Sequence, residues 1–115
     1  MLASREEIKR VIKDIRNRRN KWVLSRRPKN MATLANLAIQ ETLALDIIYN
    51  KISWQDYISG PETDDHPRPI PGDIWVFGLI IEDVECYLKF QDRPNGGVVW
   101  ISLHDAKYPM NYPYK

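Results

Sequence analysis

Two short segments near the C-terminus of this 115-residue chain carry side chains that could bind a phosphate and transfer protons. They are residues 84–91, VECYLKFQ, and residues 98–104, VVWISLH. In an extended strand, side chains two residues apart lie on the same face of the sheet. One face of the two predicted strands would therefore carry a phenol, an ammonium, a hydroxyl and an imidazole, from Tyr87, Lys89, Ser102 and His104.

This set of side chains could cleave RNA without a metal ion, because the 2′-hydroxyl of RNA can attack its own neighbouring phosphate. The reaction needs a base, an acid and positive charge beside the phosphorane. We assign the acid–base role to His104, because histidine is the side chain that most often accepts and donates protons in catalysis. Tyr87 would orient the phosphate or donate a proton, and Lys89 would stabilise the phosphorane charge. Three residues would support them: Arg93 as a second cation, Ser102 as a hydrogen-bonding group, and Trp100 as a platform for a base.

The segment between the two strands, residues 92–97 (DRPNGG), contains the Asn-Gly pair that is typical of hairpin turns. A regular six-residue loop places Tyr87 opposite Ser102. It also places Glu85 opposite His104, where the carboxylate would favour the charged imidazolium and suit His104 as a general acid. A bulge near the loop would break this register.

The first half of the chain is expected to be mainly helical. Ser4 with Glu7 forms a capping box, and apolar residues at helical spacing extend a predicted helix to about Arg18. Further elements follow in chain order: an extended segment at residues 22–24, a basic loop with Pro28 and Asn30, helices at residues 33–38 and 41–51, and a further turn of helix at residues 53–58 that Ser53 and Asp56 start.

The second half of the chain is expected to be a small sheet. Residues 61–72 are Pro-rich and are predicted to form a loop that does not join the sheet easily. Strands are expected at residues 73–77, 80–91 with a turn at Glu82-Asp83, and 98–104, and a Tyr/Pro-rich tail, residues 105–115, would lie over the domain. The predicted apolar face of the hairpin holds Val84, Cys86, Leu88, Phe90, Val99, Ile101 and Leu103.

Helices followed by three antiparallel strands predict one α+β domain over residues 1–115, with the N-terminal helices packed on one face of a small antiparallel sheet. The other face would stay open to solvent or a partner. Hydrophobic residues make up 43% and charged residues 28% of the chain, and no run has the length of a transmembrane helix or a signal-peptide core. We therefore expect a cytoplasmic protein with no membrane partner.

Cysteine and acidic residues give no sign of a metal site or cofactor. The single cysteine, Cys86, excludes an internal disulfide and a Cys-rich zinc site. Asp64, Asp65 and His66 lie together in the Pro-rich segment, but no second ligand group is spaced for them. We expect neither a metal nor a cofactor.

The positive charge is concentrated at the N-terminal end. The first 30 residues hold 11 Lys or Arg and 3 Asp or Glu, a net charge of +8, and the remaining residues carry −6. A basic end attracts polyanions, chiefly through phosphate contacts, and Arg26, Arg27 and Lys29 are the candidate RNA-binding residues. A solvated helix face that serves only solubility is the alternative interpretation.

The order of these segments resembles the MqsR family of bacterial toxins, which belongs to the wider RelE-like ribonuclease group. The resemblance extends from about residue 11 to residue 104. Its main features are the helical region, the pairs Asp56-Tyr57 and Ile74-Trp75, the triplet Tyr87-Leu88-Lys89, and a last strand that ends at His104.

The resemblance implies a toxin of a type II toxin–antitoxin system, an mRNA endoribonuclease (an mRNA interferase) that blocks translation on free or ribosome-bound mRNA. Its partner would be a cognate antitoxin with a zinc-binding N-terminal domain and a helix-turn-helix C-terminal domain. The family's catalytic Tyr falls on Tyr87, and the basic residue that closes its last strand falls on His104. The family's catalytic Lys has no equivalent, because Ile58 and Ser59 stand there, and its Gln is replaced by Val76. A non-catalytic relative that binds RNA or a partner protein is therefore the alternative.

Overall fold

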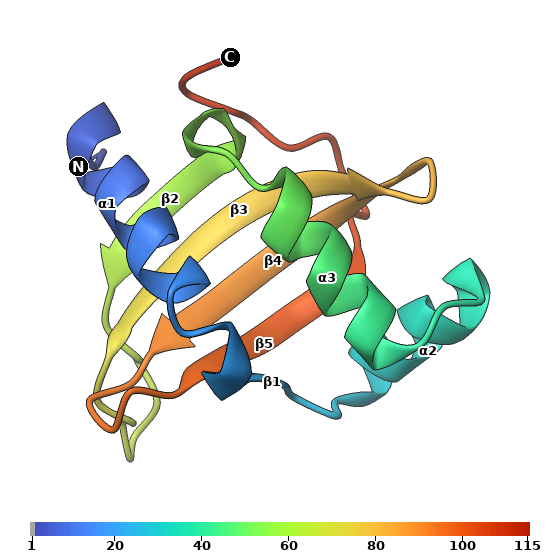
Figure 1. Ribbon diagram of the computed structural model, residues 1–115, viewed down its shortest axis with the longest axis horizontal. Coiled ribbons are helices and arrows are strands. Elements are labelled where there is room, and N and C mark those ends of the chain that lie inside the picture. Colours follow the sequence, from blue (N-terminus) through green and yellow to red (C-terminus); the bar gives the residue numbers. More distant parts are fainter. Residues whose placement is uncertain (1) are drawn as a thin grey trace.

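The fold is built on a five-stranded sheet, as seen in a computed structural model that describes residues 2–115 (Figure 1). The strands are β1 (Trp22–Leu24), β2 (Tyr57–Glu62), β3 (Asp73–Ile81), β4 (Val84–Asp92) and β5 (Val98–Asp105), and they lie in the order β1-β5-β4-β3-β2. β1 runs parallel to β5, and the other neighbours are antiparallel. The predicted three-stranded core is therefore present, and one further strand is added at each edge.

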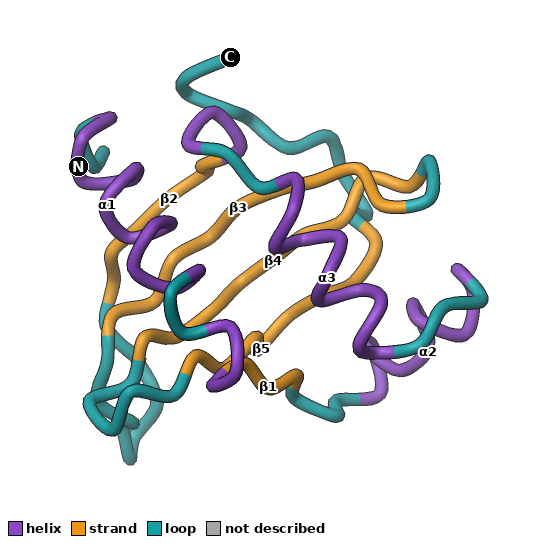
Figure 2. The backbone as a smooth tube through the Cα atoms, viewed as in Figure 1, coloured by secondary structure: helices purple, strands orange, loops and turns teal. Residues whose placement is uncertain are grey.

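The helices are α1 (Arg5–Arg16), α2 (Pro28–Leu37) and α3 (Glu41–Lys51), with single 3₁₀ turns η1 (Arg19–Lys21) and η2 (Trp54–Asp56). α1 and α3 lie across the same face of the sheet, and α2 lies beside the edge of β5 (Figures 1 and 2). The predicted α+β fold, with helices on one face of a mainly antiparallel sheet, is confirmed. Within residues 2–115, no single helix has the length and hydropathy of a membrane span, and only α2 and α3, taken together across their 85° bend, meet those criteria.

α1 begins as the sequence predicts. The Ser4 hydroxyl accepts a hydrogen bond from the Glu7 amide, and the Glu7 carboxylate accepts one from the Ser4 amide, both at 3.1 Å. The face toward the sheet consists of four buried aliphatic residues: Ile8, Val11, Ile12 and Ile15. Burying each such side chain contributes roughly 1.5–3 kcal/mol. Packing against the sheet, more than helix propensity, therefore holds this short helix in place.

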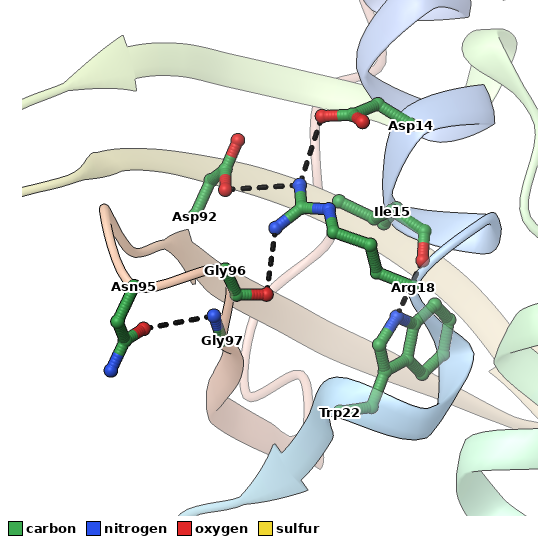
Figure 3. A network of polar contacts seen from close by, with 8 residues as sticks. All are labelled: Asp14, Ile15, Arg18, Trp22, Asp92, Asn95, Gly96 and Gly97. Carbon is green, nitrogen blue, oxygen red and sulfur yellow. Dashed lines mark hydrogen bonds and ion pairs between the residues drawn. The ribbon is translucent and has the colours of Figure 1, made fainter.

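α1 ends at Arg16, two residues before the predicted end, and the side chain of Arg18 just beyond it makes several polar contacts (Figure 3). The Arg18 guanidinium donates to the Asp14 carboxylate at 2.9 Å and to the carbonyl oxygen of Gly96 at 2.9 Å. It also lies 3.0 Å from the carboxylate of Asp92. These contacts join the helix terminus to the loop between β4 and β5.

Aromatic side chains fill the centre of the core between the helices and the sheet. The ring of Trp100 lies 5.0 Å from Trp22 and 5.0 Å from Phe90, and Phe77 stacks on Phe90 at 6.0 Å. The indole N–H of Trp22 donates to the carbonyl oxygen of Ile15 at 2.8 Å (Figure 3). Trp22 thereby joins β1, at the edge of the sheet, to α1 and to Trp100 of β5.

Two parts of the predicted secondary structure are wrong. The predicted basic loop is the start of α2, because Pro28 occupies the first helical turn, where its missing N–H has no cost. The helical turn predicted at residues 53–58 is present over Trp54–Asp56 as the 3₁₀ turn η2, with the Ser53–Asp56 capping box, but its extension to residue 58 is wrong because the chain enters β2 at Tyr57. Pro61 lies in this strand, which is possible because β2 is at the edge of the sheet. The Pro-rich loop is therefore shorter than expected.

Candidate active site

The register of β4 and β5 decides which polar side chains meet. Lys89 pairs with Ser102 and Phe90 pairs with Trp100, so Ile101 is an extra residue in β5, a β-bulge. Beyond the bulge, Tyr87 pairs with His104. The predicted pairings of Tyr87 with Ser102 and of Glu85 with His104 are therefore wrong, because the extra residue shifts the register.

Because of the bulge, the residues of β5 before Ile101 point to the opposite faces of the sheet from those that the sequence predicted. Trp100 is fully buried on the helix-covered face, against Trp22 and Phe90, and cannot stack on a base. Val99 pairs with Gln91, on the opposite face from the core. A strict alternation of period two fails at any inserted residue, so the predicted faces of Trp100, Val99 and Ile101 are wrong. The predicted faces of β4 are confirmed, with Cys86, Leu88 and Phe90 fully buried.

The rings of Tyr87 and His104 stack on the open face of the sheet. Their centroids are 5.4 Å apart, and their planes differ by 19°. His104 Nδ1 lies 3.1 Å from the carbonyl oxygen of Asp105. A carbonyl oxygen only accepts, so Nδ1 carries the hydrogen and Nε2 of the neutral ring keeps a free lone pair. This tautomer suits His104 as a proton acceptor.

Glu85 does not assist His104 in the way the sequence suggested. Its carboxylate accepts a hydrogen bond from the hydroxyl of Tyr112 at 3.0 Å, and its carbonyl oxygen accepts from the amide of Ala106 at 2.9 Å. Glu85 therefore anchors the C-terminal tail. Burial, followed by the hydrogen bond and charge of Glu85, raises the pKa of Tyr112 far above its usual range.

Tyr87 stays protonated at physiological pH. Burial is the main cause that raises the pKa of its phenol, the Glu62 carboxylate adds to the rise, and the Arg27 guanidinium opposes it. A neutral phenol donates a hydrogen bond to a phosphate oxygen or to a leaving alkoxide. Tyr87 and His104 therefore place a proton donor and a proton acceptor side by side.

A row of cationic and hydroxyl groups lies next to this pair. Lys89 and Ser102 are cross-strand partners on the same face, and Arg27 Nη1 donates to Ser102 Oγ at 3.2 Å. Arg27 reaches this row because the parallel pairing of β1 with β5 brings the chain after Leu24 beside Ser102. Two cations, Arg27 and Lys89, therefore border the place where a phosphate beside the pair would lie.

The three predicted RNA-binding residues are separated by the fold. Only Arg27 joins the site. Arg26 forms an exposed ion pair with Glu41 at 3.2 Å, and Lys29 is exposed in the first turn of α2. The apolar extended segment just before Arg27 was a sequence signal that this residue follows a strand. The sequence did not show where that strand lies, because its partner β5 is more than 70 residues away.

A cleft of about 750 Å³ extends from this row toward the β4–β5 loop. Its apolar lining comes from Ile70, Ile74, Val99 and Ile101, and its charged lining from Arg27, Glu62, Asp64, Asp65, His66, Lys89 and Arg93. Arg93 donates to the side-chain oxygen of Gln91 at 3.0 Å. It is six residues from Tyr87, about 20 Å along the strand. Arg93 therefore serves the far end of the cleft and is no second cation at the pair.

The Pro-rich loop folds over one end of the face that the sequence predicted to be open. The Gln91 amide, fully buried, donates to the carbonyl oxygens of Ile70 at 2.8 Å and Gly72 at 3.2 Å. The Asp64 carboxylate accepts from the amides of His66 and Ile70, and these two bonds lower its pKa. Asp64 thus holds the loop in place through its backbone amides. Within residues 2–115, no three His, Cys, Asp or Glu side chains are grouped in a way that could hold a metal ion.

The C-terminal tail begins at Ala106 and covers the other end of this face. Its predicted start at residue 105 is off by one residue, because Asp105 still pairs with Cys86 in β5. Met110 and Tyr112 lie against Gly78 of β3, and Gly78 is the backbone partner of Tyr87. The ring of Tyr114 packs against Tyr57, with centroids 6.0 Å apart. Between the loop and the tail, Tyr87, His104 and Lys89 stay partly exposed, whereas Ser102 is buried at 3% exposure.

No protein-family model, curated protein or solved structure matches this chain. The likeness to the MqsR toxins therefore stays a prediction. A proposal for the function depends on the arrangement of Tyr87, His104, Lys89 and Arg27 on the open face.

Proposed function

We propose that this protein is an endoribonuclease that cleaves single-stranded mRNA without a metal ion and so inhibits translation. The observation that carries the proposal is the stacked Tyr87–His104 pair beside the cations Lys89 and Arg27. Proton donor, proton acceptor and positive charge are the three requirements for attack by an RNA 2′-hydroxyl on its neighbouring phosphate.

The pair divides the proton transfers between its two rings. His104 Nε2 accepts the proton of the 2′-hydroxyl as the 2′-oxygen forms its bond to phosphorus. The bond from phosphorus to the 5′-oxygen breaks, and that oxygen takes the phenol proton of Tyr87. The products are a 2′,3′-cyclic phosphate and a free 5′-hydroxyl. Proton return from His104 to the Tyr87 phenolate, through solvent, restores the starting state.

The two cations act on the phosphate itself. The phosphorane carries more negative charge than the starting diester, so Lys89 and Arg27 bind it more strongly than the ground state. The guanidinium of Arg27 is held by Ser102 Oγ at 3.2 Å and by the carbonyl oxygen of Ile101 at 3.4 Å. Arg27 is therefore positioned before RNA binds.

The biological setting follows from the resemblance. As a toxin of a bacterial toxin–antitoxin system, the protein would act on mRNA in the cytoplasm, free or on the ribosome. A cognate antitoxin, with a zinc-binding domain and a helix-turn-helix domain, would inhibit it. The exposed basic residues Arg26 and Lys29 lie outside the cleft, and we propose that they contact the RNA backbone or this partner. Arg26 would then exchange its surface ion pair with Glu41 for a phosphate or an acidic group.

A non-catalytic RNA-binding relative is the second candidate. The observation that favours it is the position of Ile58 and Ser59, which lie in β2 where the resemblance would place a catalytic lysine. In that case Arg27 and Lys89 would bind phosphates, and the Tyr87–His104 pair would have no chemical role.

Cleavage of a defined mRNA by the purified protein in EDTA separates the two candidates. We expect fragments with cyclic phosphate ends from the wild type, and a loss of rate of about 10²–10⁴-fold in His104→Ala and in Tyr87→Phe. Tyr108→Phe is the matched control, because Tyr108 is 80% exposed in the tail. Absence of cleavage with and without ribosomes, or full activity in His104→Ala, would contradict the ribonuclease proposal.

A further inference from the structure

The cleft beside the Tyr87–His104 pair has no role in the proposed proton transfers, although it is lined by apolar and charged side chains. We infer that it binds one unpaired nucleotide next to the scissile phosphate, and that Asp65 selects a base with an exocyclic amino group. Adenine, cytosine and guanine would then be preferred over uracil. This inference rests on the proposed function, because it names the substrate feature that the same site recognises.

The cleft lies where a neighbouring nucleotide would be. Lys89 belongs both to the cleft and to the row beside the pair. It is two residues from Tyr87 on the same face of β4, a step of about 7 Å. A phosphate held at the pair therefore leaves the adjoining nucleotide over the cleft. The volume of about 750 Å³ is enough for one nucleotide.

The floor of the cleft suits the flat face of a base. It contains the branched apolar side chains of Ile74, Val99 and Ile101. Val99 faces the cleft, and Ile101 lines it, as a result of the β-bulge in β5. An apolar floor favours a base over a hydrated ion, since it offers surface for burial and no ligand for the ion.

The rim of the cleft is divided by charge. Arg27 and Lys89 lie on the side of β5 and β4, where they can hold phosphates, and the loop after β2 supplies carboxylates on the other side. The Asp64 carboxylate is already engaged by two backbone amides. Among residues 2–115, by contrast, no hydrogen bond or ion pair engages the carboxylate of Asp65, so it is available to a ligand.

A carboxylate only accepts hydrogen bonds, and this decides which bases it favours. Adenine, cytosine and guanine each present an amino group on the Watson–Crick edge, whereas uracil presents an N–H between two carbonyl oxygens that repel a carboxylate. Glu62 also lines the cleft, but it is close enough to raise the pKa of Tyr87. Asp65 is therefore the residue whose substitution changes recognition without changing the chemistry.

Binding measurements in a His104→Ala background test this without requiring cleavage. The probes are five-nucleotide RNAs, all uridine or with a single central adenosine, cytidine or guanosine, measured by fluorescence anisotropy at fixed salt. We expect the single amino-bearing base to increase affinity about 5- to 150-fold, the effect of one good base contact. Asp65→Ala should abolish this gain. Glu6→Ala, which removes the same charge from α1 on the other side of the sheet, should keep it.

A second pair of variants tests the floor. Val99→Trp should weaken binding of every probe by filling the cleft. Ile80→Trp should not, because Ile80 is 60% exposed on β3 and does not line the cleft. Equal affinity for all four probes, or a preference that survives Asp65→Ala, would overturn the inference even if the wild type cleaves RNA. A preference lost only in Asp65→Ala would support it even if cleavage fails, and failure of cleavage alone would count against the proposed function.

Discussion

The side chain of Asn30 takes the place of a neighbouring strand beside Leu103. Its Oδ1 accepts from the Leu103 amide at 2.9 Å, and its Nδ2 donates to the carbonyl oxygens of Ile101 at 3.0 Å and Ser25 at 2.8 Å. β1 ends at Leu24, so these groups at the edge of β5 would otherwise have no partner from β1. A helical side chain thus completes the sheet next to the candidate site.

Substituting Asn30 should destabilise the fold. Asn30→Ala removes the partners of the buried Leu103 amide and of the Ser25 carbonyl, and each unsatisfied group costs about 1–3 kcal/mol. The Ile101 carbonyl keeps Arg27 as a donor at 3.4 Å. We expect the free energy of unfolding to fall by about 2–4 kcal/mol in urea titrations, with an unchanged m-value. Asn50→Ala, on the exposed side of α3, is the matched control and should change stability by less than about 0.5 kcal/mol. Equal effects of the two variants would show that the Asn30 contacts add little.

Arg27 and Arg26 should differ in their effect on RNA cleavage. Arg27 is held beside Lys89 and Ser102, whereas Arg26 is paired with Glu41 at the surface. Arg27→Ala should lower kcat about 10²-fold, as the loss of one positioned donor to a developing oxyanion does. Arg26→Ala should change kcat less than about threefold and act mainly on the salt dependence of binding. Single-turnover cleavage measures both, and an equal loss in the two variants would contradict the placement of Arg27.

Gly78 should control the attachment of the C-terminal tail. A Cβ at this position would lie 2.7 Å from Met110 Cε and closer still to the Tyr112 hydroxyl, although the backbone itself tolerates alanine. Gly78→Ala should therefore displace the tail and speed tryptic cleavage after Lys107, which is already exposed, because a loosened segment is cut faster. β3 and β4 should stay paired. In a Tyr112→Ala background, Gly78→Ala should have little additional effect on stability or trypsin sensitivity. Additive effects would mean that the alanine acts elsewhere.

Stability should fall at alkaline pH because of Cys86. Burial, together with the charges of Asp105 and Glu85, raises the pKa of the Cys86 thiol from 9.0 to about 11. The folded state thus holds the proton more tightly, so its stabilisation is complete below pH 9 and is lost as the pH rises toward 11. Two pKa units correspond to about 2–3 kcal/mol.

Urea unfolding at pH 8, 9, 10 and 11 checks this pH dependence. Cys86→Ala should flatten the decline between pH 9 and pH 11. The raised pKa of Tyr87 adds a further loss of the same sign, which begins near pH 10, where tyrosine in the unfolded chain loses its proton. A Cys86→Ala variant that declines as steeply as the wild type would place the alkaline sensitivity in the tyrosines.

Local patterns were enough to predict much of the framework. The capping box at Ser4 and Glu7, the helical spacing in α1 and the alternation in β4 depend on residues within a few positions of one another, and the structure confirms all three. Tyr87 and Lys89 were placed on the open face for the same reason. His104 was also placed correctly, because it follows the bulge at Ile101 and the regular alternation of β5 continues from Ser102 to His104.

Long-range contacts decided the rest of the site. The stack of Tyr87 on His104 depends on one inserted residue in β5, and nothing local to Ile101 identifies it as a bulge. Arg27 reaches Ser102 only because β1 pairs in parallel with a strand more than 70 residues later. Trp100 lies in the core, where it packs against Trp22 and Phe90, two residues far from it in the sequence or on another strand. Side-chain chemistry and strand periodicity can be read along the chain, but register and cross-sheet contacts result from packing the whole core, and the pair, its cations and its cleft depend on them.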